Sequence, residues 1–214
     1  MLLYYITDRS QFAGGEQTQR LALLKKVAEA ASGGVDFIQL REKDLPAREL
    51  ERLARQAIPA IRDSSGHEPS RTRLLINSRT DVALACGADG VHLRSDDVSP
   101  GDVRSAWNHL PREKAVPVIS VSCHSAAAIA QVAAGGADLA LFAPVFEKPG
   151  SAHSCAAGLE TLREACRQGV PVLALGGVTA ENAQSCIEAG AAGVAGIRLF
   201  QQGHIREIVK RLRG

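Results

Sequence analysis

A glycine, a small residue and an acid stand directly before a short apolar run in Gly87-Ala88-Asp89-Gly90-Val91-His92-Leu93. The device recurs at intervals of 49 to 54 residues, in Gly34-Val35-Asp36, Gly136-Ala137-Asp138 and Gly190-Ala191-Ala192. Such a glycine can take the left-handed conformation that ends a helix, and the small residue after it lets the chain turn tightly into a strand. The repeat therefore predicts four equivalent helix-to-strand connections, spaced two βα units apart.

Outward from this repeat, short apolar runs rich in β-branched residues alternate with longer segments of helical composition. The expected strands are Leu2–Ile6, Asp36–Leu40, Arg73–Ile76, Gly90–Leu93, Val116–Val121, Leu139–Phe142, Val172–Leu175 and Gly193–Ile197. The expected helices are Glu16–Ala31, Pro46–Arg62, Thr80–Cys86, Val98–Asn108, Ala126–Ala134, Leu159–Arg167, Ala180–Ala189 and His204–Leu212. This alternation predicts an α/β fold, a (β/α)8 TIM barrel made by a single domain over residues 1–214, with a doubly wound open sheet as the alternative.

The composition excludes several classes of function. The 25 Lys and Arg against 23 Asp and Glu leave a formal net charge of +2, and the aromatic residues are only five Phe, two Tyr and one Trp, so we expect no nucleic acid partner. The five cysteines form no C-x-x-C pair and are expected to be reduced thiols. The apolar N-terminal run stops at Asp8 without a basic segment before it, and no longer apolar stretch follows. We therefore expect a cytoplasmic protein that does not enter the membrane.

In such a barrel the active site lies at the carboxyl ends of the strands, which directs attention to the residues that follow each apolar run. Gln39, Arg41 and Lys43 follow the second run at alternate positions, so they are expected to face the same way. Two cations and an amide at the barrel mouth suit a phosphate or pyrophosphate. The alternative interpretation is that both cations are solvated and pair with the acidic residues at positions 8, 42 and 44.

A glycine pair, Gly176-Gly177, follows the seventh run and precedes an expected helix, and Gly196 lies in the eighth run. Glycines let the backbone approach an anion closely, and the unpaired N–H groups at a helix start donate to it. The seventh and eighth strands are where barrels of this kind often bind phosphate. The sequence therefore predicts a phosphate site here, against the alternative of a turn that needs only backbone freedom.

Asp96-Asp97, after the fourth run, is the best candidate for a hard cation such as Mg²⁺, which prefers carboxylate oxygens and often bridges to substrate phosphates. Either carboxylate could instead cap the helix expected to begin near Val98.

Ser122-Cys123-His124 follows the fifth run. Adjacent residues of a strand face opposite sides, so a Cys123–His124 nucleophilic dyad is not expected. We expect Ser122 to face the mouth as a hydrogen-bond donor, and His124 to begin the next loop as an acid–base group or as a surface residue.

Seven motifs, in this order and across nearly the whole chain, resemble the superfamily of thiamine-phosphate synthases and TenI-type thiazole tautomerases. They are Tyr5-Ile6-Thr7-Asp8-Arg9, Gln39-Leu40-Arg41-Glu42-Lys43-Asp44, Leu75-Ile76-Asn77, Gly87-Ala88-Asp89-Gly90-Val91-His92-Leu93, Asp96-Asp97, Ser122-Cys123-His124-Ser125 and Gly176-Gly177-Val178.

The resemblance implies a transferase that joins a hydroxymethylpyrimidine diphosphate to a thiazole phosphate with Mg²⁺ as cofactor, releasing pyrophosphate. It implies that the diphosphate substrate is held by Gln39, Arg41, Lys43 and Asn77 and that Asp97 binds the metal. It also implies that Ser122 lies near the pyrimidine and that the thiazole phosphate is cradled by Gly176, Gly177, Ala195 and Gly196.

Two departures keep alternatives open. Ser78 stands where the synthases have a second metal carboxylate, and the loop after the sixth run lacks a Thr-x-Thr-Lys pattern, although Lys148 or Ser151 could replace its grip on pyrophosphate. A TenI-type tautomerase that uses His124 for metal-independent proton transfer is the second hypothesis, and a non-catalytic barrel that binds a phosphorylated ligand is the third. The sequence leaves a homo-oligomer open.

Overall fold

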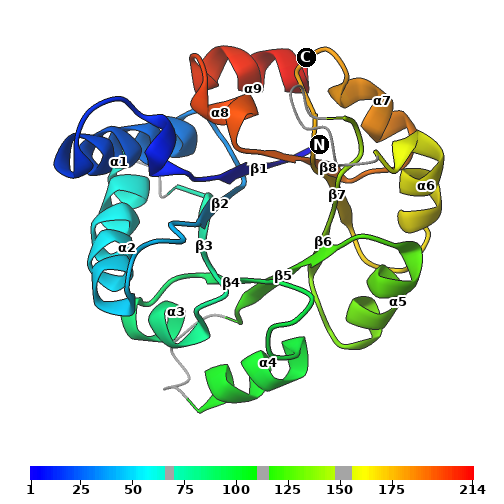
Figure 1. The fold of residues 1–214 in the computed structure, drawn as a ribbon, viewed down its shortest axis with the longest axis horizontal. Coiled ribbons are helices and arrows are strands. Elements are labelled where there is room, and N and C mark those ends of the chain that lie inside the picture. The colour runs from blue at the N-terminus through cyan, green and yellow to red at the C-terminus, as the bar shows by residue number, and fades with distance from the viewer. Residues whose placement is uncertain (66–69, 110–115, 148–155) are drawn as a thin grey trace.

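Eight parallel strands close into a barrel with the helices outside it in the computed structural model, which describes residues 1–65, 70–109, 116–147 and 156–214 (Figure 1). Each strand pairs with the next in chain order, and β8 closes the ring on β1. The strands are β1 (Leu2–Ile6), β2 (Phe37–Leu40), β3 (Arg73–Asn77), β4 (Gly90–Leu93), β5 (Val118–Cys123), β6 (Leu139–Phe142), β7 (Val172–Ala174) and β8 (Gly193–Gly196). The predicted TIM barrel is confirmed, and the open sheet is excluded.

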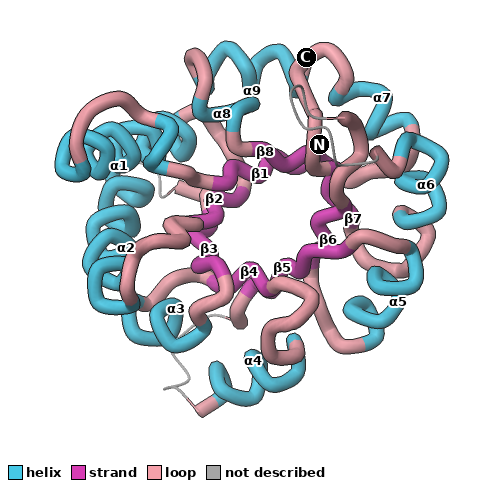
Figure 2. Tube along the Cα trace, in the orientation of Figure 1, coloured by secondary structure: helices cyan, strands magenta, loops and turns pink. Residues whose placement is uncertain are grey.

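The helices form an outer ring around the strands (Figure 2). They are α1 (Glu16–Ser32), α2 (Ala47–Arg62), α3 (Thr80–Cys86), α4 (Pro100–Asn108), α5 (Ala126–Ala134), α6 (Gly158–Ala165), α7 (Ala183–Glu188), α8 (Arg198–Gln201) and α9 (Ile205–Arg213), with 3₁₀ turns at Arg9–Gln11 and Asp63–Ser65. The short helix α8 was not expected, and α7 begins three residues later than expected. In the described part of the chain, no helix has both the length and the apolar character needed to cross a membrane.

The repeated glycine–small–acid device has a structural explanation. The four glycines have positive φ angles, which are +86° at Gly34, +73° at Gly87, +85° at Gly136 and +102° at Gly190. In the first three repeats the acid accepts a backbone N–H of the preceding strand: Asp36 from Leu3 at 2.7 Å, Asp89 from Leu74 at 2.8 Å and Asp138 from Ile119 at 2.8 Å. The carboxylate thus satisfies a donor near the start of an odd-numbered strand, and Ala192 offers none in the fourth repeat.

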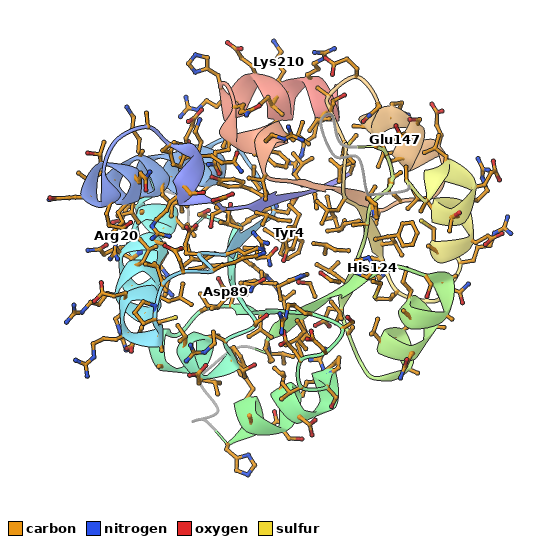
Figure 3. All side chains as sticks on the ribbon, viewed as in Figure 1. Tyr4, Arg20, Asp89, His124, Glu147 and Lys210 are labelled. Carbon is orange, nitrogen blue, oxygen red and sulfur yellow. The ribbon has the colours of Figure 1, made fainter. Side chains whose placement is uncertain are left out.

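Alternation along the strands divides the core into two parts. A small apolar cluster that includes Tyr4, Leu75, Leu141 and Leu173 lies inside the barrel, and Figure 3 shows Tyr4 within the ring of strands. A much larger cluster lies between the strands and the helices. Polar side chains on inward-facing positions of β2 to β5 replace the apolar ones: they are Gln39, Asn77, His92, Ser120 and Ser122. One side of the barrel interior is therefore polar.

The cysteines that the structure describes, Cys86, Cys123, Cys166 and Cys186, are free thiols as expected, and Cys155 lies outside the described residues.

Candidate active site

A buried amide marks the polar side of the barrel interior. Gln39 is 1% exposed, and its Nε2 donates to Oδ1 of Asn77 at 2.7 Å. Its Oε1 is also buried and has no hydrogen-bond partner among the described residues. Because a buried acceptor without a partner is costly, this oxygen is a place where a bound molecule can donate a hydrogen bond.

Arg9 binds the two acidic side chains nearest to Arg41 in the sequence, Glu42 and Asp44. The Arg9 guanidinium is 4% exposed and binds Oε2 of Glu42 at 3.1 Å and Oδ2 of Asp44 at 2.6 Å. Thr7 Oγ1 donates to Oε1 of Glu42 at 2.6 Å and accepts the backbone N–H of Arg41 at 3.0 Å. The Arg9–Glu42 pair therefore ties the loop after β1 to the loop after β2 and holds the backbone from which Arg41 projects.

The expected ion pairs of Arg41 and Lys43 with neighbouring acids do not form. Glu42 and Asp44 are bound by Arg9, and Asp8 accepts hydrogen bonds from Ser10 and Gln11. Within the described ranges, neither cation has an ion-pair partner. The ion pairs of the alternative interpretation are therefore absent from this part of the chain, because the more deeply buried Arg9 takes Glu42 and Asp44, although the charge of Arg41 still adds to the hydrogen bonds that lower the pKa of Asp8.

Lys43 departs from the expected alternation. The strand β2 ends at Leu40, and the backbone N–H of Leu45 donates to the carbonyl of Glu42 at 3.3 Å, which makes a turn. Lys43 is exposed on this turn, so the structure does not place it on the inward face with Gln39. The strand period applies only as far as the chain stays extended.

His92, whose role the sequence analysis did not predict, is a buried titratable group of the site. It is 4% exposed, with Nδ1 at 2.9 Å from Ser120 Oγ and Nε2 at 2.8 Å from Ser122 Oγ. Burial and, to a lesser extent, the positive charge of Arg41 lower the pKa of His92 to about 3, while the negative charge of Asp97 opposes the shift. Arg41 and Asp97 therefore both lie close enough to act on this imidazole, and the imidazole is neutral at physiological pH.

Ser122, Cys123 and His124 face three environments. Ser122 points inward to His92, whereas Cys123 belongs to the outer core, where burial raises the pKa of its thiol to about 11. His124 is exposed near the β5–β6 side of the ring (Figure 3), and its Nδ1 lies 2.7 Å from the carbonyl oxygen of Ala143. A carbonyl can only accept, so Nδ1 carries the proton and Nε2 is the free acceptor of the neutral ring. The absence of a Cys123–His124 dyad is confirmed.

Asp97 is partly buried, and Asp96 is not. The Asp97 carboxylate is 14% exposed and accepts the backbone N–H of Arg94 at 2.8 Å, whereas the Asp96 carboxylate is 69% exposed. Both carboxylates pair with the Arg94 guanidinium, Asp96 at 3.1 Å and Asp97 at 3.6 Å. Neither acid caps α4, because Ser99 is the N-cap and accepts the backbone N–H of Asp102 at 3.2 Å. The expectation of a cap at Asp96 or Asp97 was wrong.

The donor set for Mg²⁺ is small. No group of three or more His, Cys, Asp and Glu side chains that could hold a metal exists among the residues that the structure describes. Ser78, which stands where the synthases have a second metal carboxylate, has a φ of +56°. Its backbone N–H donates to the carbonyl of His92 at 2.8 Å. Mg²⁺ commonly keeps several waters and binds one or two carboxylates together with substrate phosphates, so Asp97 alone fits the ion with a phosphorylated substrate present.

A second region lies at β7 and β8, where a cavity of about 710 Å³ is lined by Gly176, Gly177, Ala195 and Gly196. Gly177 has a φ of +66°, and a Cβ added there would lie 2.7 Å from the carbonyl oxygen of Glu147. The residues that follow it form a turn and not the expected helix start. The close approach of two loops therefore requires glycine at this position.

The helix N-terminus at this cavity belongs to α8. This helix begins at Arg198, two residues after Gly196, and Arg198 and Leu199 in its first turn line the cavity. Its first backbone N–H groups have no partner within the helix and are suited to an anion. Arg198 is exposed and lines the cavity, so it lies at the rim.

Lys148 and Ser151 lie outside the described residues.

Comparison with known proteins agrees with this arrangement. Residues 3–200 match the family described as thiamine monophosphate synthase. A relative from Geobacter sulfurreducens is 43% identical over 195 residues, covering 90% of this chain and 83% of that protein. A thiamine-phosphate synthase from Methanoculleus marisnigri is 36% identical over 219 residues, covering 99% of this chain and 93% of that protein.

A solved structure is similar over nearly the full length of both chains. The thiamine phosphate pyrophosphorylase from Pyrococcus furiosus superposes with a TM-score of 0.78 at 27% identity, covering 99% of this chain and 93% of that chain. The residues that match the family model, 3–200, include residues of all eight strands and both regions of the site. The chain belongs to the thiamine monophosphate synthase family.

Proposed function

We propose that this protein is a thiamine-phosphate synthase, which joins a hydroxymethylpyrimidine diphosphate to a thiazole phosphate and releases pyrophosphate. Family membership supports the reaction class. The observation that carries the proposal is the pairing of two unlike regions in one barrel. On one side, Gln39 Oε1 has no hydrogen-bond partner and the Arg41 guanidinium has no ion-pair partner among the described residues, and on the other side lies a glycine-lined cavity with a helix N-terminus.

The first region suits the pyrimidine diphosphate. The Gln39 oxygen can accept from an amino group on the ring, and Asn77 holds the Gln39 amide in place. Arg41 and Lys43 supply positive charge for the diphosphate, and Arg41 offers two parallel donors where Lys43 offers a point charge. Ser122, on the inward face of β5, contacts the pyrimidine.

Asp97 would hold Mg²⁺, with water and diphosphate oxygens completing its coordination. When bound, the ion neutralises charge on the leaving pyrophosphate. Lys148, the remaining substrate-binding candidate, would assist it from the loop after β6.

The second region suits the thiazole phosphate. Gly176, Gly177, Ala195 and Gly196 present backbone without obstructing side chains, and the first N–H groups of α8 donate to the phosphate. The proposed reaction needs no covalent intermediate with the protein, and the Cys123 thiol, whose pKa is raised by burial, faces away from the barrel interior.

In the reaction, the carbon–oxygen bond of the diphosphate breaks with its electron pair leaving on pyrophosphate. The pyrimidine methylene carries the positive charge until the thiazole nitrogen attacks it and forms the new carbon–nitrogen bond. Arg41 and Lys43 lower the barrier by stabilising the negative charge that develops on the leaving group.

The direct test incubates the purified protein with both substrates, with and without Mg²⁺, and follows thiamine phosphate by mass spectrometry. We expect product and pyrophosphate in equal amounts, only with the divalent ion. Product formation at an unchanged rate without the ion, or no product with it, would refute the assignment.

A thiazole tautomerase is the second candidate, favoured by the free Nε2 of His124 and by Ser78 in place of a carboxylate. It predicts metal-independent aromatisation of a thiazole carboxylate phosphate that is lost in His124→Ala and kept in Asp97→Ala. If the protein is a synthase, formation of thiamine phosphate should instead be lost in Asp97→Ala and kept in His124→Ala.

A further inference from the structure

Four side chains form a continuous hydrogen-bonded row inside the barrel. Tyr4 Oη lies 2.9 Å from Ser120 Oγ, Ser120 Oγ lies 2.9 Å from His92 Nδ1, and His92 Nε2 lies 2.8 Å from Ser122 Oγ. The row starts at the completely buried Tyr4 on β1 and ends at the partly exposed Ser122 on β5. It thus connects the closed interior of the barrel to the proposed pyrimidine site.

The buried end determines the direction of the hydrogen bonds. Tyr4 is 0% exposed, and burial holds the pKa of its hydroxyl well above the ordinary value, so the phenol keeps its proton. Within the described part of the chain, Ser120 is its only hydrogen-bond partner. A buried hydroxyl that does not donate loses a hydrogen bond without compensation from water. Tyr4 therefore donates to Ser120.

The donor and the acceptor of each following hydrogen bond can then be assigned. Ser120 is also 0% exposed, and Tyr4 and His92 are the only hydrogen-bond partners of its hydroxyl among the described residues. Because Tyr4 is the donor in the first of these bonds, the single proton of Ser120 has only Nδ1 of His92 to receive it, and a buried hydroxyl that does not donate is costly. His92 is neutral because of its burial and carries one proton, which must be on Nε2. Nε2 donates to Ser122 Oγ, and the proton of Ser122 is left to point away from His92.

We propose that Tyr4, Ser120 and His92 are positioning residues that present the Ser122 hydroxyl to the substrate as a hydrogen-bond donor. The substrate atom selected at this point is then an acceptor, an unprotonated nitrogen of the aromatic ring. The opposite direction would make Ser122 an acceptor and would leave the buried Tyr4 hydroxyl without a partner to receive its proton. The contact with substrate rests on the proposed function, whereas the direction of the row does not.

The direction can be measured on the ligand-free protein. Histidine is labelled with ¹⁵N, and the two nitrogens of His92 are identified by NMR as the signals missing in His92→Gln. We expect one neutral tautomer at pH 7 with the proton on Nε2, unchanged at pH 5. A proton on Nδ1, or an imidazolium at pH 5, would overturn the proposal without involving any substrate.

Two variants at opposite ends of the row test which end sets the direction. Tyr4→Phe removes the buried donor, so Ser120 is free to turn and both tautomers of His92 become populated. Ser122→Ala removes the exposed end and is expected to keep the proton on Nε2. The reverse outcome, a mixture in Ser122→Ala and none in Tyr4→Phe, would show that the mouth sets the direction. Ser120→Ala is expected to mix the tautomers as well, and provides the same test if Tyr4→Phe does not fold.

Substrate analogues test the contact. Two analogues of the pyrimidine diphosphate, each with a different ring nitrogen replaced by C–H, are compared by KM. We expect one of them to bind wild-type protein about tenfold more weakly than the parent, and to lose that difference in Ser122→Ala. In Tyr4→Phe, where about half of the molecules keep the donor direction, the affinity for the parent falls about twofold.

The outcomes distinguish the direction of the hydrogen-bonded row from the contact between Ser122 and the substrate. If the His92 proton is on Nε2 but Ser122→Ala leaves the analogue preference unchanged, the row is directed as inferred and the placement of the pyrimidine at Ser122 is refuted. If the proton is on Nδ1 while the synthase reaction proceeds, the proposed function stands and the positioning role of the row is refuted.

Discussion

Replacement of Gly177 by alanine tests whether the phosphate cavity depends on the close approach of two loops. The added Cβ would lie 2.7 Å from the Glu147 carbonyl oxygen, 2.7 Å from Phe146 Cβ and 2.8 Å from the Phe146 carbonyl oxygen. Two of these neighbours are backbone atoms and cannot rotate away. The loop after β6 must therefore move, and the cavity that it lines must change shape.

Gly169→Ala provides a matched control. Gly169 has a φ of +81°, against +66° at Gly177, but nothing lies within 4 Å of an added Cβ. Both variants lose about 1–2 kcal/mol of stability because alanine is strained in the left-handed conformation, and both regain about 0.4–1 kcal/mol because alanine stiffens the unfolded chain. Only Gly177→Ala adds the cost of overpacking, about 1–3 kcal/mol.

The assay is thermal unfolding of both variants, followed by turnover measurements. At about 2–4 °C per kcal/mol for a chain of this size, Gly177→Ala should unfold roughly 6 °C below Gly169→Ala. It should also raise KM for the thiazole phosphate, while Gly169→Ala should not. Equal melting temperatures, or an unchanged KM in Gly177→Ala, would refute the argument from close approach.

Three further predictions concern charged and titratable groups. Arg41→Ala should raise KM for the diphosphate substrate by about 10- to 100-fold, as expected for lost charge-assisted hydrogen bonds, whereas the exposed Arg48→Ala on α2 should leave it unchanged; similar values for both would contradict the role of Arg41. Asp97→Asn should raise the Mg²⁺ concentration needed for half-maximal activity with little change in melting temperature, and an identical Mg²⁺ titration would remove Asp97 from the metal site. His92 has a folded pKa of about 3 and an unfolded pKa of about 6.5, so its stabilising contribution is complete above pH ~6.5 and is lost as the pH falls, by up to about 1.4 kcal/mol per pH unit. Denaturant unfolding between pH 7 and pH 5 should show this slope in the wild type and a smaller one in His92→Gln, and equal slopes would mean that His92 is not buried as a neutral ring.

The fold was predictable because its signals are local. The glycine that ends each of four helices and the acid that follows it act within a few residues, and hydrophobic alternation marks each strand. The short helix α8 was missed because four residues give no periodicity, and its position is set by the turn after Gly196. The cap of α4 was misplaced by two residues, because Asp96, Asp97 and Ser99 are all suitable cap residues by type.

The site was predictable only in part. The positions of Gln39, Asn77 and Ser122 on the inward face follow from the strand period, and the structure bears this out by the Gln39–Asn77 hydrogen bond. The exposed position of Lys43 did not follow, because the chain turns after Leu40. Glu42 illustrates the same limit, since its sequence neighbours are cations but its partner is Arg9, from another loop.

The order of strands and helices, and the end of the barrel to which polar residues belong, could be derived from the amino-acid sequence by itself, because backbone geometry and burial act on neighbouring residues. The partners of each polar group were decided by the closed barrel, which brings together side chains from β1, β4 and β5 that lie up to 116 positions apart. Hydrogen bonds and ion pairs form between groups that meet in space, so the neutral state of His92, the ion pairs of Arg9 and the unpaired Arg41 could be seen only once the ring was closed.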